Sequence, residues 1–150
     1  MVSTRNFWRL CRPPHRFAMH KPLILIDGEC VLCNRFARFV IRHDKAAIFQ
    51  FAALGSAHAQ ERLEHFSLPP PPAGTFVVIE NGKAYVRSEA ACRVLMSLPP
   101  PLRYAATLRL VPLPLRDAVY SLIARLRYAV FGRTTSCGLL SPEEKSRFLA

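Results

Sequence analysis

The sequence lacks several features that would place it in a familiar class. It has no apolar run long enough to cross a bilayer, and its first residues lack the apolar core of a secretory signal. Its 5 cysteines are odd in number and unevenly spaced, which argues against a secreted disulfide framework. We therefore expect a protein of a reducing compartment, the cytoplasm, or an organellar matrix if the source is eukaryotic.

Acidic residues are also scarce, at 10 against 21 Lys and Arg. Residues 1–20 are Arg-rich and acid-free, and we predict a disordered extension there, with an organellar transit peptide as the alternative. Residues 21–98 are predicted to form the core, and residues 99–150 a basic helical extension packed on it. No nucleic-acid-binding module accompanies the charge, so we expect solvated arginines rather than a specific nucleic-acid partner.

The spacing of apolar residues predicts alternating strands and helices. Expected strands are Leu23–Asp27, Ala47–Ala53, Thr75–Glu80 and Lys83–Arg87, the last two joined by a hairpin at Asn81-Gly82. Expected helices run from Cys30 to about Asp44, over Ser56–Phe66, and from an N-cap at Ser88 to Leu98. This order predicts an α/β thioredoxin-like fold, a mixed central sheet with flanking helices, followed by helices only.

Two cysteines one helical turn apart, Cys30 and Cys33, carry the most informative motif. Cys30 falls where the first strand turns into a helix, and the free N–H groups and dipole of a helix N-terminus favour a thiolate. The thiolate is the species that attacks a disulfide, and a neighbouring thiol can then resolve the mixed disulfide. We therefore predict Cys30 as the attacking thiol and Cys33 as the more buried, resolving thiol.

The acids beside the motif modify this expectation. The negative charge of Glu29 disfavours a thiolate at Cys30. The Cys30–Cys33 redox pair is therefore expected to be reducing or of intermediate potential rather than a strong oxidant. Asp27 ends the first strand, where its carboxylate is either a proton relay for the resolving thiol or a residue that caps the turn. Both interpretations of Asp27 stay open from the sequence.

A CxxC pair is also half of many zinc sites, which need about four ligands. The chain has no second CxxC, and its histidines show no ligand spacing. We therefore expect no metal and no cofactor. A small metal-binding or interaction domain that uses the same cysteines as ligands is the alternative function.

The motif and its surroundings resemble a known family. Residues 27–34, Asp-Gly-Glu-Cys-Val-Leu-Cys-Asn, are similar to the signature of the DCC family of predicted thiol–disulfide oxidoreductases, named for DxxCxxC. Further similar motifs follow in order: Ser88–Ala90, Leu115–Tyr120, Arg127-Tyr128, Phe131–Arg133, Cys137, Pro142–Glu144 and Arg147–Leu149. The resemblance covers residues 21–149 and implies a thioredoxin-like fold with Cys30 and Cys33 as the redox pair.

Several other residues have either a functional or a purely structural interpretation. Thioredoxins carry a cis-proline before the strand that faces the CxxC; Gly74-Thr75 occupies that place here, so Thr75 is a candidate for facing the thiols and substrate. Cys137 is a candidate third exchange partner, although a buried thiol is the commoner case. Cys92 is expected in the core, and Tyr104, Tyr120 and Tyr128 are expected to be packing anchors.

The last part of the chain carries an apolar stripe with arginines beside it. The stripe consists of Leu115, Val119, Leu122, Ile123, Leu126 and Val130. Such a stripe usually packs on its own domain, and we expect this here, with peripheral contact to an anionic membrane as the alternative. The sequence as a whole predicts an enzyme that exchanges disulfides with protein or small-molecule thiols.

Overall fold

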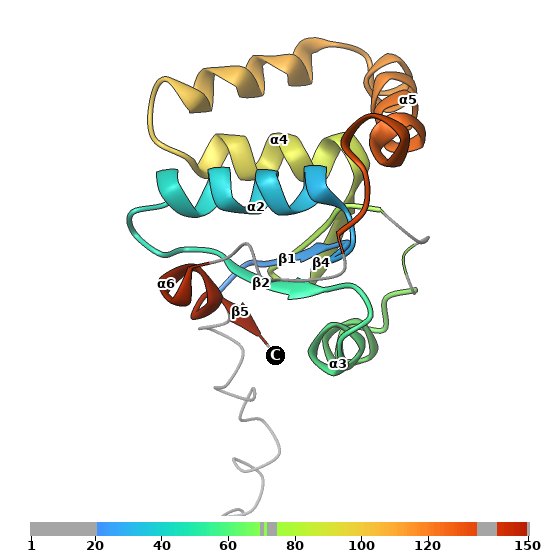
Figure 1. Cartoon of the computed structure of the whole chain (residues 1–150). Helices are drawn as coiled ribbons and strands as arrows, with labels where there is room; N and C mark the ends of the chain where they lie inside the picture. Colours follow the sequence, from blue (N-terminus) through green and yellow to red (C-terminus); the bar gives the residue numbers. More distant parts are fainter. Residues whose placement is uncertain (1–20, 70, 72–74, 135–140, 150) are drawn as a thin grey trace, which may run out of the picture.

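A computed structural model describes residues 21–69, 71, 75–134 and 141–149. Within these residues, five strands form one sheet in the order β4-β3-β1-β2-β5 (Figure 1). β1 pairs in parallel with β2 and antiparallel with β3, β3 forms a hairpin with β4, and β5 pairs in parallel with β2. The strands are β1 (Leu23–Ile26), β2 (Gln50–Ala53), β3 (Val77–Glu80), β4 (Lys83–Val86) and β5 (Phe148–Leu149).

Helices connect and cover these strands. They are α2 (Val31–His43), α3 (Ala57–His65), α4 (Arg87–Ser97), the 3-10 helix η2 (Leu102–Leu110), α5 (Leu113–Phe131) and α6 (Pro142–Lys145). α2 is the crossover between the parallel strands β1 and β2, and it ends where the sequence predicted, at the C-cap Asp44. The mixed sheet with flanking helices confirms the expected thioredoxin-like α/β class, and α5 supplies a C-terminal helix.

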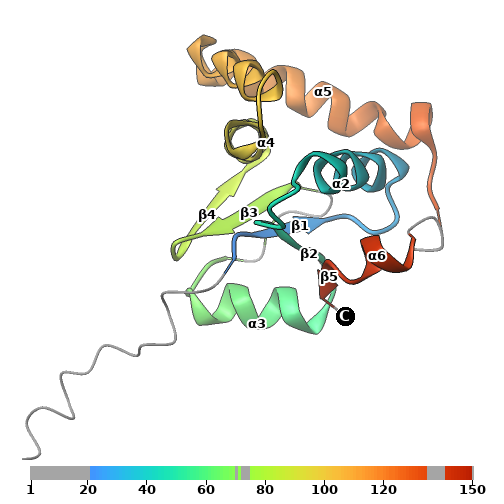
Figure 2. The same ribbon diagram turned by 90° about the vertical axis from the view of Figure 1, so that its left-hand side faces the viewer.

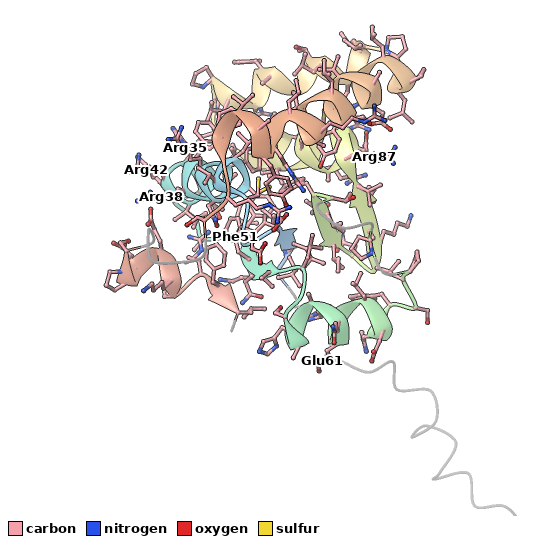
Figure 3. All side chains as sticks on the ribbon, turned by 45° about the vertical axis from the view of Figure 1, so that its right-hand side comes forward. Arg35, Arg38, Arg42, Phe51, Glu61 and Arg87 are labelled. Atoms are coloured by element: carbon pink, nitrogen blue, oxygen red, sulfur yellow. The ribbon has the colours of Figure 1, made fainter. Side chains whose placement is uncertain are left out.

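The continuous apolar run of β1 reflects a strand that is covered on both faces. Because side chains alternate along a strand, Ile24 and Ile26 join one core cluster with α2 and α4, while Leu23 and Leu25 join another with α3. Phe51 of β2 is also fully buried and lies at the centre of the molecule (Figure 3). β1 therefore sits in the middle of the fold and holds the residues that follow it in a fixed place.

The helices form layers on the sheet. α3 covers one face, α2 and α4 cover the other, and η2 and α5 lie outside α2 and α4 as a further layer (Figures 1 and 2). Figure 3 shows a basic face of α2, with Arg35, Arg38 and Arg42 on one side of the helix. Arg38 of this face pairs with Glu144 of α6 at 3.5 Å.

The end of the chain differs from the prediction that only helices follow residue 98. α6 begins with a capping box, in which the Ser141 hydroxyl accepts the N–H of Glu144 at 3.2 Å and the Glu144 carboxylate accepts the N–H of Ser141 at 2.8 Å. The next residues, however, form β5 at the sheet edge, where Phe148 stacks on Phe51 with ring centroids 5.3 Å apart. The division of the chain at residue 98 stays a prediction.

Two further expectations about the helices are wrong. Ser88 is not the N-cap of α4: Val86 holds that position, and the Ser88 hydroxyl donates to the Asp117 carboxylate of α5. Most of the apolar stripe of α5 faces outwards, with its residues 48–67% exposed, because the inward side of that helix carries Arg116, Tyr120 and Arg127. Tyr104 of η2 is likewise 65% exposed and anchors nothing in the core.

Asp44 ties the C-terminal strand to the rest of the sheet. Its carboxylate is 4% exposed and accepts the N–H groups of Ile48 and Phe49, both at 3.0 Å, and it also accepts a guanidinium N–H of Arg147. Arg147 in turn donates to the Phe49 carbonyl at 3.2 Å. One buried carboxylate thus accepts hydrogen bonds both from the loop before β2 and from the residue before β5.

We expect Asp44→Ala to lower the free energy of unfolding by about 3 kcal/mol, because it leaves two backbone donors and a guanidinium without their acceptor. Urea denaturation followed by circular dichroism measures the change. Glu61→Ala is the matched control: this exposed α3 residue (Figure 3) has only a 4.0 Å contact with His58, and its loss should cost under about 0.5 kcal/mol. Equal losses in the two variants would contradict the role of Asp44.

Candidate active site

The CxxC motif lies at the N-terminus of α2, directly after β1. Cys30 is the N-cap residue, and its sulfur accepts the backbone N–H of Cys33 at 3.4 Å. The turn is held by two further bonds, from the Cys30 N–H to the Asp27 carbonyl at 3.2 Å and from the Asn34 side-chain amide to the Gly28 carbonyl at 2.9 Å. Cys30 therefore occupies the predicted position, where helix N–H groups meet a negative charge.

The exposure of the two thiols is the reverse of the prediction. Cys30 is 0% exposed and Cys33 is half-buried. The segment that follows α5 covers Cys30, because Arg133 forms a β-bridge with it and the Thr134 N–H donates to the Glu29 carbonyl at 2.9 Å. Gly132 has φ +79°, a left-handed conformation that favours glycine and turns the chain from α5 towards the motif.

A cation from α5 reaches the same place. Arg127 donates to the Asp27 carboxylate at 3.2 Å, to the Tyr128 hydroxyl at 3.1 Å and to the Cys33 sulfur at 3.8 Å. The Tyr128 hydroxyl donates to the same Asp27 oxygen. The other Asp27 oxygen accepts the Glu29 N–H at 3.0 Å, a bond within the turn that leads to α2.

Buried charge determines which thiol holds its proton. The pKa of Cys33 is raised to about 12, first by burial and then by the hydrogen bond to the Cys30 sulfur and the negative charge of Cys30, against the lowering effect of Arg127. Burial lowers the pKa of Arg127, but the negative charges around it, first those of Cys33 and Cys30, raise it overall. Burial and the hydrogen bond to Asp27 raise the pKa of Tyr128. In the reduced protein, Cys33 is therefore a protonated thiol beside a permanent cation.

A cavity of about 260 Å³ opens beside Cys33 between α2 and α5. Apart from Arg127 and the Tyr120 hydroxyl, its lining is apolar or sulfur-bearing. The lining residues are Leu32, Cys33, Phe36, Phe76, Ala91, Tyr120, Ile123, Ala124 and Arg127. The Tyr120 hydroxyl accepts the Phe76 N–H at 3.0 Å and so fixes the start of β3 against α5.

Comparison with known proteins agrees with this geometry. The model of the DCC1-like thiol-disulfide oxidoreductase family matches residues 24–133, which include the CxxC motif and most of the residues around it. The chain belongs to this family.

Two curated relatives extend the match. An uncharacterized protein of Bacillus subtilis (strain 168), YuxK, is 41% identical over 127 residues, which cover 85% of this chain and 93% of the relative. The DCC family protein At1g52590, chloroplastic, of Arabidopsis thaliana is 37% identical over 121 residues, 79% of this chain and 70% of the relative. No solved structure matches the chain.

Within this DCC1-like chain, the structure brings together Asp27, Cys30 and Cys33 as predicted. Thr75 is buried but does not line the cavity; its neighbour Phe76 does, and a role for Thr75 towards the thiols stays a prediction. Cys137 and residues 1–20 lie outside the described residues. Cys92 is 4% exposed, as expected for a core thiol.

Arg127 and Tyr128 are the functional candidates that the sequence reasoning missed. The sequence carried a signal for Arg127, because Arg116, Tyr120 and Arg127 recur at helical spacing on one side of an otherwise apolar helix. Tyr128 was expected only to pack; instead its ring lies under the guanidinium groups of Arg127 and Arg133 and its hydroxyl bonds Asp27. Among the described residues of α5, Arg127 alone is buried.

Two kinds of feature are absent from the described residues. No group of three or more His, Cys, Asp or Glu side chains is placed there to hold a metal ion. None of the helices in the described part of the chain has the length and apolar character needed to span a bilayer.

We expect the ionisation of Cys33 to depend on Cys30. In a reduced variant whose thiols are Cys30 and Cys33 alone, ultraviolet absorbance should show that Cys33 keeps its proton until about pH 12. Adding Cys30→Ser should lower the pKa of Cys33, because the charge and the sulfur hydrogen bond of Cys30 both favour the protonated form. An unchanged pKa of Cys33 would show that the two sulfurs do not interact.

Proposed function

We propose that this chain is an enzyme that exchanges disulfides through Cys30 as nucleophile and Cys33 as resolving thiol. The observation that supports this most is that the two sulfurs at one helix N-terminus have different environments. The Cys30 sulfur receives the Cys33 N–H, whereas burial and the neighbouring charge keep Cys33 protonated. A dithiol centre needs one anionic and one neutral sulfur for a defined first step.

In the first step, the Cys30 thiolate attacks one sulfur of a substrate disulfide. The substrate S–S bond breaks, its second sulfur leaves as a thiolate and takes a proton from water, and a mixed disulfide forms at Cys30. In the second step, Cys33 gives its proton to water and attacks the Cys30 sulfur as a thiolate. The bond between Cys30 and the substrate breaks, and the remaining substrate sulfur leaves as a thiolate that takes a proton from water. The substrate gains two electrons and the protein holds a Cys30–Cys33 disulfide, which an external dithiol must reduce before the next turnover.

The charges explain why Cys33 reacts second. While Cys30 is an anion, its charge and hydrogen bond raise the pKa of Cys33. Once Cys30 is part of a mixed disulfide, that negative charge is gone, and Arg127, 3.8 Å from the Cys33 sulfur, favours the new thiolate. Formation of the mixed disulfide therefore prepares the thiol that resolves it.

Asp27 acts here through Arg127. It bonds both Arg127 and Tyr128, and no direct contact with Cys33 is needed for it to hold the guanidinium against that sulfur. We therefore assign Asp27 as a positioning residue, and proton relay by Asp27 stays a prediction.

Access to Cys30 requires a local movement. Because Cys30 is 0% exposed beneath Gly132–Thr134, this segment has to shift before a protein disulfide can reach the sulfur. The cavity beside Cys33 then offers an apolar surface for the group that carries the substrate sulfur. Protein or small-molecule disulfides are the proposed substrates, and a cytoplasmic or organellar-matrix location is the proposed setting.

Cys30→Ser should abolish reduction of insulin or of a model disulfide, because no thiolate remains for the first step. Cys33→Ser should instead accumulate mixed disulfides, detected by mass spectrometry without reductant. Cys92→Ser is the matched control, since Cys92 is a buried thiol outside the motif, and it should retain activity. Full activity of Cys30→Ser would overturn the assignment, and chelator-sensitive, metal-loaded protein without activity would favour the ligand alternative.

Arg127→Gln should slow the second step by about tenfold, because losing this cation raises the pKa of Cys33 and leaves less of its thiolate. The lifetime of a preformed mixed disulfide at Cys30, followed against pH, measures this step. The pH at which resolution reaches half its maximum should rise, and Arg127→Lys should restore part of the rate. Arg125→Gln, on the exposed side of α5, is the control and should change neither; an effect of equal size there would contradict the proposal.

A further inference from the structure

The outward side of α5 carries large apolar residues along its whole length. Its large hydrophobic residues are between 39% and 67% exposed, in contrast to an ordinary surface helix, which turns its apolar stripe inwards. These residues are Leu113, Leu115, Val119, Leu122, Ile123, Leu126, Val130 and Phe131. We call this set the α5 apolar face.

η2 continues the same surface. Its exposed apolar residues are Tyr104, Leu108 and Leu110, the last of them 87% exposed. η2 and α5 together form the outermost helical layer, at the top of the molecule in Figures 1 and 2. Contiguous apolar surface of this kind marks a place where a protein meets another phase or molecule.

The charges around this surface are mainly positive. Residues 102–134 contain six arginines and one acid, Asp117, which is bonded to the Ser88 hydroxyl on α4. Arg109 and Arg116 pair with Glu89 of α4, and Arg127 pairs with Asp27. Arg103, Arg125 and Arg133 are exposed. An anionic surface therefore complements both the apolar face and its rim.

We propose that η2 and the α5 apolar face bind the surface of an anionic membrane, with α5 lying in the plane of the interface. Such a helix buries its apolar face at the headgroup boundary, and basic residues add attraction to anionic lipids. The other side of α5 stays packed on the domain through Tyr120, Arg116 and Arg127.

The composition of this surface favours lipid as its partner over another protein, a second copy of the chain or residues 1–20. Protein interfaces concentrate binding energy in Trp, Tyr and Arg, with Leu and Val under-represented, whereas Leu and Val dominate here. Binding of a second copy would bring the arginines of the two surfaces together. Residues 1–20 are themselves basic and acid-free, so repulsion between positive charges disfavours both a dimer and binding of this segment. A convex helical ridge of aliphatic residues is well suited to fluid acyl chains.

One residue connects this surface with the cavity. Ile123 belongs to the α5 apolar face and also lines the cavity beside Cys33. Membrane binding would therefore bring the cysteine pair close to the lipid surface. The consequence for substrates rests on the proposed function, but the binding itself does not.

The test is co-sedimentation of the full chain carrying Cys30→Ser and Cys33→Ser, which removes thiol chemistry from the measurement. We expect binding to phosphatidylglycerol-containing vesicles, several-fold weaker binding to phosphatidylcholine vesicles, and weakening as salt is raised. Leu122→Glu should reduce binding to anionic vesicles at least about tenfold. Ile48→Glu is the matched control, with the same charge change at a residue 39% exposed elsewhere, and should reduce binding much less.

Circular dichroism and light scattering on the same samples separate the remaining outcomes. Leu122→Glu should keep the helical spectrum, and the protein should be monomeric with or without it. A dimer that Leu122→Glu dissociates, or equal losses of binding in the two Glu variants, would overturn the proposal. So would failure to bind anionic vesicles, whatever the result of the thiol assays.

Discussion

The contact between Arg127 and its three partners ties the active site to the rest of the fold. A buried guanidinium is costly unless its charge is matched and its donors are used. Here the match comes from Asp27 at the end of β1, the Tyr128 hydroxyl and the Cys33 sulfur in α2. These groups come from three elements, so β1, α2 and α5 must hold their relative positions for the ion contact to exist.

The same contact bears on the proposed chemistry of the two sulfurs. Burial, the hydrogen bond to Cys30 and the charge of Cys30 raise the pKa of Cys33, while Arg127 lowers it. In the proposed mechanism, the mixed disulfide removes the negative charge of Cys30, and Arg127 then favours the thiolate of Cys33 without changing its own position. The arrangement is therefore suited to the two proposed steps rather than to one protonation state.

The sequence predicted features that depend on neighbouring residues and missed those that depend on distant ones. The Asn81-Gly82 turn and the helix predicted over Ser56–Phe66 follow from local hydrogen bonding and backbone preference, and both appear. β5 is two residues long, which is too short to show the alternation of apolar and polar residues that predicts a strand. It forms because β2 has an unpaired edge and because Asp44 holds Arg147, the residue before β5. Cys30 is covered by a segment about 100 residues further along the chain.

The largest error, the orientation of α5, has the same origin as the active site. A helix has one side to pack with, and α5 uses that side to deliver Tyr120, Arg127 and the Asp117 partner of Ser88. The aliphatic residues that periodicity assigned to the core must then face outwards. Burying Leu122 and its neighbours instead would rotate Arg127 into solvent and leave Asp27 and Cys33 without a cation. α5 therefore exposes its aliphatic residues because its inner side is used for the charged contact of Arg127. A surface that covers these aliphatic residues would remove them from water and leave the contact of Arg127 in place.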